Sequence, residues 1–336
     1  MKPFRQNTPI DTSLHINELD SVQQFAEDVR AGLGKTPKSL PCIYFYDETG
    51  SKIFEQICRQ PEYYCTRAEG EILQTHACDI AAHCCDPVQI VELGSGSSAK
   101  TRILLEAFVE AKIQTTYVPI DVSPEILSEG ADRLRKVFPF LVIKPIAARY
   151  EDGLEKLDSR NEPVLLLWLG SSIGNYERTS AKRFLGRLRR QLTAGDSLLL
   201  GVDLIKDVSE LEAAYNDRAG VTAAFNLNVL ERINRELGGT FNPEQFEHDA
   251  VFNTAEGRIE MYLISRCRQQ VQIEALDMTI QFSRGERIHT ENSYKYHPEE
   301  IAGLGEAISA NLVHQWFDAR KRFSLNLFDI KNGGSL

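Results

Sequence analysis

The sequence has no run of basic residues, no paired-cysteine motif and no long apolar segment. Its 336 residues carry a net charge of −10, so we expect no nucleic-acid or anionic-membrane partner. A transmembrane helix needs about 20 consecutive apolar residues, and no segment approaches that length. The first ten residues, MKPFRQNTPI, also lack the apolar core of a signal peptide. We therefore expect a cytoplasmic protein.

The cysteines are seven in number, an odd count with no C-x-x-C pair, which argues against a disulfide framework. The densest group lies in HACDIAAHCC, where two histidines and three cysteines fall between His76 and Cys85. This spacing matches no familiar zinc motif. A helix that buries small thiols explains the stretch better, so we expect no metal site.

Short apolar segments alternate with amphipathic ones from residue 88 onward. Strands are expected at VQIVEL, TTYVPID, FLVIKPIA, VLLLWLG and DSLLLGVDL, with helices between most of them. Apolar strands separated by helices are typical of a parallel sheet covered on both faces. The sequence therefore predicts an α/β fold.

The flanking segments follow other patterns. Residues 19–33 and 50–64 are predicted helices, the second stopped by Pro61, and residues 206–250 look helical. Strand-like runs follow, and the chain ends with a helix, PEEIAGLGEAISA, and two strands, LVHQWFD and RFSLNLF. We interpret this order as a parallel-sheet domain that an insertion interrupts.

A glycine loop, ELGSGSSA, stands where the strand VQIVEL meets the next helix. Gly94 and Gly96 allow a tight turn and close backbone approach to a ligand, and with Ala99 they satisfy the dinucleotide spacing G-x-G-x-x-A. Asp121 ends the next strand, where a carboxylate accepts both hydroxyls of a ribose. These features fit a nicotinamide enzyme, an S-adenosylmethionine (SAM) enzyme, or a tight turn without a ligand.

Three features favour SAM. Glu92 precedes the loop, as an acid does in many SAM-dependent methyltransferases. The final helix and two strands resemble the closing hairpin of that fold. The segment LGSSIGN falls at the carboxyl end of a strand, where the methyl donor and the acceptor would meet.

Longer motifs make the resemblance specific. The chain resembles the histidine-specific Nα-methyltransferases of ergothioneine biosynthesis, and the matching stretches are spread in order over most of the sequence. They are YFYDETGSKIFEQICRQPEYYCTRAE, VELGSGSSAKT, YVPIDVSPEIL, LGSSIGN, GVDLIKD, AYNDRAGVTAAFNLNVLERINRELGG, RIEMYL and HTENSYKY.

The resemblance implies an enzyme that methylates the α-amino group of L-histidine three times with SAM, giving hercynine. It implies a Rossmann-like parallel sheet with a closing antiparallel hairpin, plus an inserted α+β substrate-binding domain. The SAM domain would comprise residues 69–205 and 295–336, and the substrate domain residues 1–68 and 206–294. The free amino acid is the expected partner, and a monomer is expected.

The resemblance also assigns site residues. Gly94, Lys100 and Asp121 look like SAM contacts. Tyr64, Asn175 and Tyr215 look like contacts to the amino-acid backbone, and hence the catalytic set. Glu291 and Ser293 look like imidazole contacts, with Met261 packing on the ring. Any of these side chains could instead serve ordinary packing or face solvent, and Lys100 is the plainest case.

One departure from the family pattern concerns adenine. An acid followed by an aromatic is common after the third strand, where AARYED places Arg149 and Tyr150. Arg149 cannot accept a hydrogen bond from the adenine amino group. Adenine recognition then rests on backbone groups, on stacking against Tyr150, or on a nearby acid such as Glu151.

The octapeptide HTENSYKY, residues 289–296, is either a wet surface turn or one wall of a polar ligand site. A neutral imidazole has one donor and one acceptor. Glu291 can accept the ring N–H and Ser293 can donate to the other nitrogen, because residues two apart on an extended segment share a face. The rest of the chain favours this reading.

Three rival functions stay open at this point. The first is an enzyme of the same class for another aromatic amino acid, although a tryptophan site is expected to lack the Glu291 carboxylate and the bulk of Met261. The second is a nicotinamide-dependent oxidoreductase. The third is a non-catalytic ligand-binding homologue, which Arg149 favours slightly.

Overall fold

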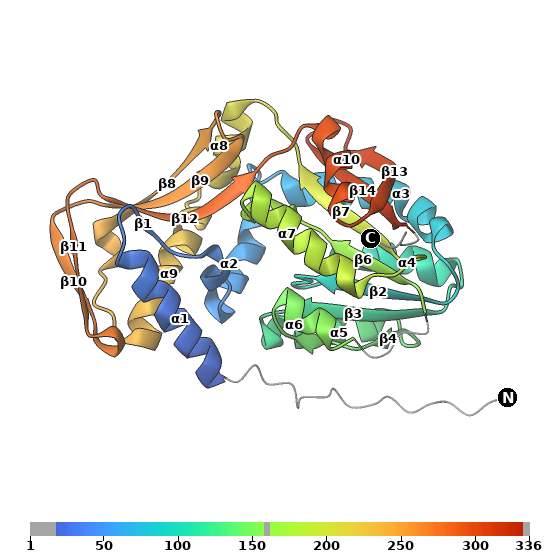
Figure 1. Cartoon of the computed structure of the whole chain (residues 1–336), viewed down its shortest axis with the longest axis horizontal. Helices are drawn as coiled ribbons and strands as arrows, with labels where there is room; N and C mark the ends of the chain where they lie inside the picture. The colour runs from blue at the N-terminus through green and yellow to red at the C-terminus, as the bar shows by residue number, and fades with distance from the viewer. Residues whose placement is uncertain (1–17, 158–161, 332–336) are drawn as a thin grey trace.

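Two sheets organise the protein. The computed structural model describes residues 18–157 and 162–331, and within them a large sheet and a smaller one lie on opposite sides of the molecule (Figure 1). The large sheet has eight strands and the smaller one four, and a separate two-stranded ribbon extends the smaller side. None of the helices in the described ranges is both long and apolar enough to cross a membrane.

The large sheet has the strand order β13-β14-β7-β6-β2-β3-β4, and β5 also pairs with β3. The strands from β2 to β7 run parallel, whereas β14 is antiparallel to β7 and β13 is antiparallel to β14. Their bounds are β2 Val88–Leu93, β3 Thr115–Asp121, β4 Val142–Ile143, β5 Ile146–Ala147, β6 Val164–Trp168, β7 Ser197–Asp203, β13 Ala310–Phe317 and β14 Phe323–Ile330. The predicted parallel sheet and closing hairpin are thereby confirmed.

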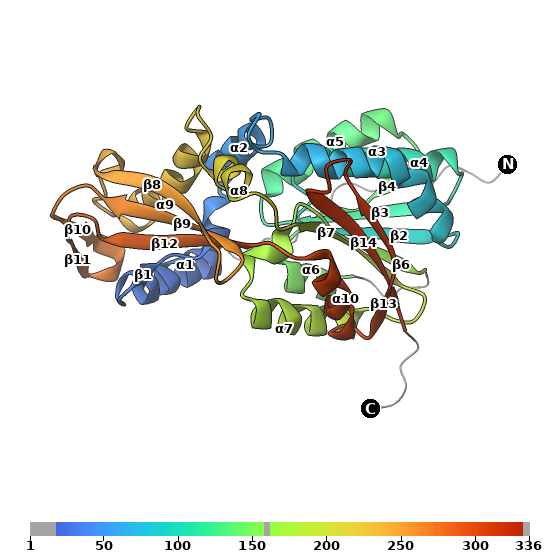
Figure 2. The same cartoon turned by 90° about the horizontal axis from the view of Figure 1, so that it is seen from above.

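Helices cover both faces of this sheet, which explains its uniformly apolar strands (Figure 2). Successive residues of one strand point to opposite faces, so Ile90 joins one hydrophobic cluster and Val91 the other. On the first face lie α3 (Cys65–His83) and α4 (Thr101–Glu110). On the second lie α6 (Tyr150–Glu155), α7 (Arg178–Leu188) and α10 (Pro298–Glu306).

The smaller sheet has the order β1-β12-β9-β8. Its strands are β1 Lys38–Ser39, β8 Phe246–Asn253, β9 Arg258–Ser265 and β12 Arg287–Tyr294, and the ribbon is β10 Gln269–Ile273 with β11 Met278–Phe282. Helices on this side are α1 Glu18–Leu33, α2 Glu48–Ile57, α8 Val208–Tyr215 and α9 Val221–Leu237. The long helix α9 supplies five buried apolar side chains to the cluster beneath the sheet: Phe225, Val229, Leu230, Ile233 and Leu237.

Two of the points at which the chain crosses between the two sheets are neighbours. After β7, Leu204 forms a parallel bridge with Tyr296, which follows β12. The Tyr296 N–H donates to the Asp203 carbonyl at 3.0 Å, and the Ile205 N–H donates to the Tyr296 carbonyl at 3.0 Å. The two crossings therefore form a single joint.

Three predicted elements were wrong in detail. The predicted strand FLVIKPIA is two short strands, β4 and β5, because Pro145 between them has no N–H for the sheet. The predicted helix 50–64 ends at Ile57, ahead of Pro61. The predicted helical region 206–250 contains the start of β8, whose residues pair with β9 along its whole length.

Candidate active site

The loops at the carboxyl ends of the parallel strands meet at one edge of the large sheet. From β2 the sheet extends to β3 on one side and to β6 on the other, so the loops after β2 and β6 diverge. Ligands of open α/β sheets bind in the crevice at such a point. The glycine loop, Asp121, the segment 169–175 and Asp203 all follow or end these strands.

The glycine loop adopts left-handed backbone geometry, with φ of +68° at Gly94 and +49° at Gly96. A Cβ on Gly94 would lie 2.6 Å from the Tyr150 hydroxyl, whereas a Cβ on Gly96 would meet open space. The buried Ser95 hydroxyl in the same loop has no hydrogen-bond partner in the described part of the chain. The loop is thus tightly packed at Gly94 and still has a buried hydroxyl, on Ser95, that a bound ligand could satisfy.

Asp121 is tied to this loop. Its carboxylate accepts the Gly96 N–H at 2.9 Å through Oδ2 and the Ser123 N–H at 3.1 Å through Oδ1. Burial raises the pKa of Asp121, although these backbone N–H groups oppose the shift. Each carboxylate oxygen keeps lone-pair capacity for a further donor such as a ribose hydroxyl.

Tyr150 and Arg149 lie at the start of α6. The Tyr150 ring packs edge-on against Trp168, with centroids 6.3 Å apart, and its hydroxyl lies against Gly94. The exposed Arg149 lies beside the Tyr44 hydroxyl, where its charge lowers the pKa of Tyr44 against the stronger effects of burial and Asp28. Arg149 thus faces the side of the smaller sheet.

Glu92 and Lys100 both have partners within the protein. Glu92 accepts hydrogen bonds from Thr101 at 2.6 Å and from Tyr117, and burial raises its pKa to about 7. Lys100 is paired with the fully buried Glu69, which also accepts the Gly170 N–H at 2.8 Å. These bonds hold the glycine loop to the loop after β6. A contact between Lys100 and SAM stays a prediction.

The octapeptide 289–296 is largely the buried strand β12, not a surface turn. A bulge between His289 and Glu291 shifts the register, so these two residues face opposite sides of the sheet although they are two apart. His289 and Asn292 bond to each other at 2.9 Å on the outer face. Glu291 and Ser293 are buried on the inner face. The predicted pairing of Glu291 with Ser293 therefore fits the backbone, and the bulge at Thr290 puts His289 on the other face.

Glu291 is a buried carboxylate without a partner. Its side chain is 8% exposed, and no hydrogen bond to it exists among residues 18–157 and 162–331. Burial raises its pKa to about 7, against the opposing charge of Lys295. Met261 stands opposite Glu291 on β9 and is 1% exposed. A buried carboxylate that no protein group satisfies indicates a ligand.

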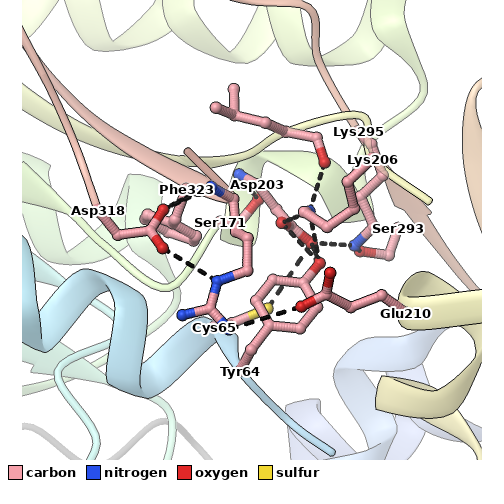
Figure 3. Close-up of polar contacts among 12 residues, drawn as sticks. Tyr64, Cys65, Ser171, Asp203, Lys206, Glu210, Ser293, Lys295, Asp318 and Phe323 are labelled. Atoms are coloured by element: carbon pink, nitrogen blue, oxygen red, sulfur yellow. Dashed lines mark hydrogen bonds and ion pairs between the residues drawn. The ribbon is translucent and has the colours of Figure 1, made fainter. Parts of the chain in front are cut away.

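A closed polar network lies next to this open group (Figure 3). Asp203 at the end of β7 receives Lys295 at 2.8 Å, Lys206 at 2.6 Å and the Tyr64 hydroxyl at 2.8 Å. Burial would raise the pKa of Asp203, but the two lysines outweigh burial and hold it at about 2. Lys295 also donates to Tyr215 at 2.9 Å and to Ser293 at 2.8 Å. This network supports the two predicted substrate contacts Tyr215 and Ser293 from behind.

Tyr64, predicted to contact the substrate amine, is 1% exposed, and its hydroxyl is engaged with Asp203 and Lys206. The neighbouring Tyr63 is half-buried, its ring lies 6.3 Å from the Tyr215 ring, and its hydroxyl has no partner in the described ranges. The contact of Tyr64 with the substrate amine stays a prediction, and Tyr63 is a second candidate for it. The dipeptide gives no sequence signal for the choice, because only the direction of each side chain separates the two.

Two further polar side chains, Tyr46 and Asn175, are candidates for the same substrate site. Burial raises the pKa of Tyr46, and the charge of Glu291 raises it further. Asn175 ends a short 3-10 turn, Ser172–Asn175, that approaches β12 closely because a Cβ on Gly174 would lie 2.7 Å from the Tyr294 carbonyl oxygen. Within the described chain, no protein group bonds to the Asn175 amide or the Tyr46 hydroxyl. Both groups are available to a substrate.

The cysteine and histidine stretch does not form a metal centre. His83 bonds to Asp329 at 2.9 Å, and His76 bonds to Asp79 at 3.0 Å. All seven cysteines are free thiols. No group of three or more potential ligands that could hold a metal ion occurs in residues 18–157 and 162–331.

The strand order, the glycine loop after β2, the acid at the end of β3 and the antiparallel closing hairpin define a SAM-dependent methyltransferase. The sequence profile described as histidine-specific methyltransferase, SAM-dependent, matches residues 25–330. The chain belongs to this family, so the predicted family and methyl donor are confirmed.

Relatives span nearly the whole chain. The histidine N-alpha-methyltransferase of Mycolicibacterium smegmatis is 43% identical over 91% of this chain and 95% of its own length. The enzyme of the same name from Mycobacterium tuberculosis is 41% identical over 95% of this chain and 98% of its own length. Ergothioneine biosynthesis protein 1 of Neurospora crassa is 32% identical over 83% of this chain, which corresponds to 32% of that longer protein.

Proposed function

We propose that the protein transfers three methyl groups from SAM to the α-amino nitrogen of L-histidine, giving hercynine for ergothioneine biosynthesis. The observation that carries the proposal is the unpaired, buried Glu291 carboxylate beside the Ser293 hydroxyl. Together they offer one acceptor and one donor, which is the complement of a neutral imidazole. The names of the relatives from the two mycobacteria support the same substrate.

The amino-acid backbone of the substrate needs partners of its own. We assign the carboxylate to the Asn175 amide, which can donate to it, and the amine to Asn175 and Tyr63. Tyr215 would contact the substrate through its ring, which lies beside Tyr63, because its hydroxyl proton goes to Ser293. Methyl transfer from a sulfonium is an in-line displacement by an unprotonated amine, so the main contribution of these groups is positioning. Tyr64 then supports the wall through Asp203 and does not touch the amine.

The product carries a quaternary ammonium, which can no longer accept or donate a hydrogen bond. Aromatic faces stabilise such a cation by roughly 0.5–2 kcal/mol each. Tyr46 and Tyr63 are near enough to Glu291 and Tyr215, respectively, to line this space. An aromatic wall lets one site bind substrate and each methylated intermediate in turn.

The SAM side of the proposal rests on the glycine loop. Asp121 would accept the ribose hydroxyls, Gly94 would permit close backbone approach, and Tyr150 would stack on the adenine. The unpartnered Ser95 hydroxyl adds a free polar group in the same loop. Lys100 would act through the loop after β6, because its ammonium is held by Glu69. Arg149 would stand at the rim and leave the adenine edge to backbone groups.

We further propose the domain division 69–205 with 295–336 and 1–68 with 206–294. The two sheets support it, because the chain leaves the large sheet after β7 and returns to it after β12. Residues 1–17, 158–161 and 332–336 of these ranges lie outside the described residues. A cytoplasmic monomer fits the seven free thiols and a candidate site drawn from one chain.

The rival with the most support is the same chemistry on another aromatic amino acid. Mass spectrometry separates the candidates if each free amino acid is incubated with the protein and SAM and then examined for one, two or three added methyl groups. We expect histidine alone to gain three. A protein that trimethylates tryptophan and not histidine would overturn the substrate assignment, and one that methylates no amino acid would overturn the function.

A further inference from the structure

Lys295 lies behind the candidate substrate site and has no exposed surface. Its side chain and that of Asp203 are both 0% exposed. The ammonium has three N–H groups, and each has one partner: Asp203 Oδ2 at 2.8 Å, Tyr215 Oη at 2.9 Å and Ser293 Oγ at 2.8 Å. An ammonium can only donate, so all three of these oxygens act as acceptors toward Lys295.

The two hydroxyls that Lys295 contacts also contact each other, with Tyr215 Oη 2.8 Å from Ser293 Oγ. Their two protons cannot both lie between the two oxygens. Tyrosine is the more acidic hydroxyl and donates to Ser293 in this arrangement. The Ser293 oxygen then accepts from both Lys295 and Tyr215, which fills its two lone pairs. The Ser293 proton has no direction left except away from the network.

We infer that Lys295 is a positioning residue that makes the Ser293 hydroxyl a donor toward the substrate ring. The inference rests on the proposed function and names the means by which that site selects its ring. Glu291 on the same face accepts an N–H, and Ser293, fixed by Lys295, donates to a ring atom that must be an acceptor. The site therefore selects rings that carry an N–H and an acceptor nitrogen together.

A purely structural role for Lys295 explains less of the geometry. Asp203 already receives Lys206 and the Tyr64 hydroxyl, so it has two partners besides Lys295. Lys206 also bonds to Tyr64, but it has no contact with Ser293 or Tyr215 among the described residues. The two lysines on one carboxylate therefore form a matched pair: one connects Asp203 to the ring-binding hydroxyls, and the other does not.

The test uses two histidine analogues in which one ring nitrogen is replaced by a C–H: 3-(pyrrol-2-yl)alanine and 3-(pyrrol-3-yl)alanine. One of the two keeps its N–H facing Glu291 and loses the acceptor facing Ser293. The measured quantity is the ratio of kcat/KM for histidine to kcat/KM for each analogue, followed as methyl transfer from SAM. In the wild type we expect histidine to be favoured by about tenfold or more over both analogues.

Lys295→Met should lower the ratio by about tenfold for the analogue that keeps its N–H at Glu291. Without the ammonium, the Ser293 proton can turn to Tyr215 and no longer needs a ring acceptor. Ser293→Ala should lower the ratio as much, and the double variant Ser293→Ala/Lys295→Met should lower it no further, because both changes remove one interaction. The matched control Lys206→Met should leave the ratio unchanged.

A second variant guards against misfolding. Lys295→Met/Asp203→Asn/Lys206→Met removes the carboxylate and both lysines, so no charge of this cluster is left without a partner, and it should show the same fall in the ratio. An unchanged ratio in both Lys295 variants, with a lowered ratio in Ser293→Ala, would overturn the inference and leave the proposed function intact. A wild type that transfers no methyl group to histidine would overturn the proposed function itself.

Discussion

Two buried carboxylates lie on either side of Lys295, and their surroundings are opposite. Asp203 is completely buried, is paired with two lysines and a tyrosine, and has a pKa of about 2. Glu291 is 8% exposed, has no hydrogen-bond partner within the described chain, and burial raises its pKa to about 7. The first carboxylate is satisfied by the protein and belongs to its framework. The second is left for a ligand to satisfy.

The SAM side repeats this contrast. Glu92 is closed off by Thr101 and Tyr117, whereas Asp121 accepts only backbone N–H groups from its own turn and the glycine loop. In both halves of the site, an acid with side-chain partners stands beside an acid that keeps free acceptor capacity. Substitutions at the acids with side-chain partners, Asp203 and Glu92, should lower the stability of the fold. Substitutions at the acids without them, Glu291 and Asp121, should weaken ligand binding.

Breaking the closed cluster should have the largest effect. Asp203→Ala would leave Lys295 buried without its carboxylate, which costs about 3–5 kcal/mol of unfolding free energy. Urea unfolding followed by circular dichroism measures the loss. Asp132→Ala, which removes an exposed aspartate, is the control and should change the midpoint little. A midpoint for Asp203→Ala equal to that of the control would mean that the ion pair is not part of the framework.

Breaking the open group should affect catalysis. Glu291→Ala should lower kcat/KM for histidine by about 2–4 kcal/mol of transition-state binding, because it removes a charged hydrogen bond from a buried site. Adding Met261→Val would deepen the pocket and should shift the histidine-to-tryptophan ratio of kcat/KM toward tryptophan. The single variant Met261→Val is the control. If the ratio does not move in the double variant, these two residues do not line the side-chain pocket.

The open acid on the SAM side should give a somewhat smaller effect. Asp121→Ala would remove two charge-assisted hydrogen bonds to the ribose, but water can replace part of them at this half-buried position, so SAM affinity should fall about tenfold, or roughly 1.4 kcal/mol. Isothermal titration calorimetry measures the change, with Asp121→Asn as the variant that keeps size and one acceptor. Unchanged SAM binding in Asp121→Ala would reject the assignment.

A pH series sharpens the comparison further. The pKa of Glu291 is raised from 4.5 to about 7 in the folded protein, so the group contributes stability below about pH 4.5 that is lost as pH rises through about 7. Glu291→Gln removes this penalty. The ligand-free variant should therefore gain about 2–3 kcal/mol over the wild type at pH 8, relative to their difference at pH 5. If the difference in unfolding free energy between the variant and the wild type does not change with pH, the fold does not raise the pKa of Glu291.

Arg149 should give the smallest effect. It is exposed beside Tyr44, and we assign adenine recognition to backbone groups, so Arg149→Asp should tighten SAM binding slightly or leave it unchanged. Arg149→Ala separates the loss of the guanidinium from the gain of a carboxylate. Severe loss of SAM binding by well-folded protein in both variants would give Arg149 a positive role of its own.

Much of the fold could be predicted because it depends on local pattern. Apolar strands, the glycine loop and the Asp121 position follow from short stretches of sequence. The contacts between residues far apart in the sequence could not be predicted, because only the folded sheets bring these residues together. Lys295 meets Asp203 across the joint between the sheets, and nothing local to either residue marks the pair. Thr290 shifts β12 by one position, an offset that only its pairing with β9 reveals.

The paired crossings at Leu204 and Tyr296 have a mechanical consequence. Two segments that hydrogen-bond to each other resist twisting, so the two sheets can bend relative to each other mainly about an axis through the joint. Displacement in such a bend grows with distance from its axis. Asp203 and Lys295 directly precede the two joint residues in sequence, and the Asp203 carbonyl accepts the Tyr296 N–H. In such a bend, the ion pair between Asp203 and Lys295 would stay nearly fixed, while groups farther from the joint would be displaced more.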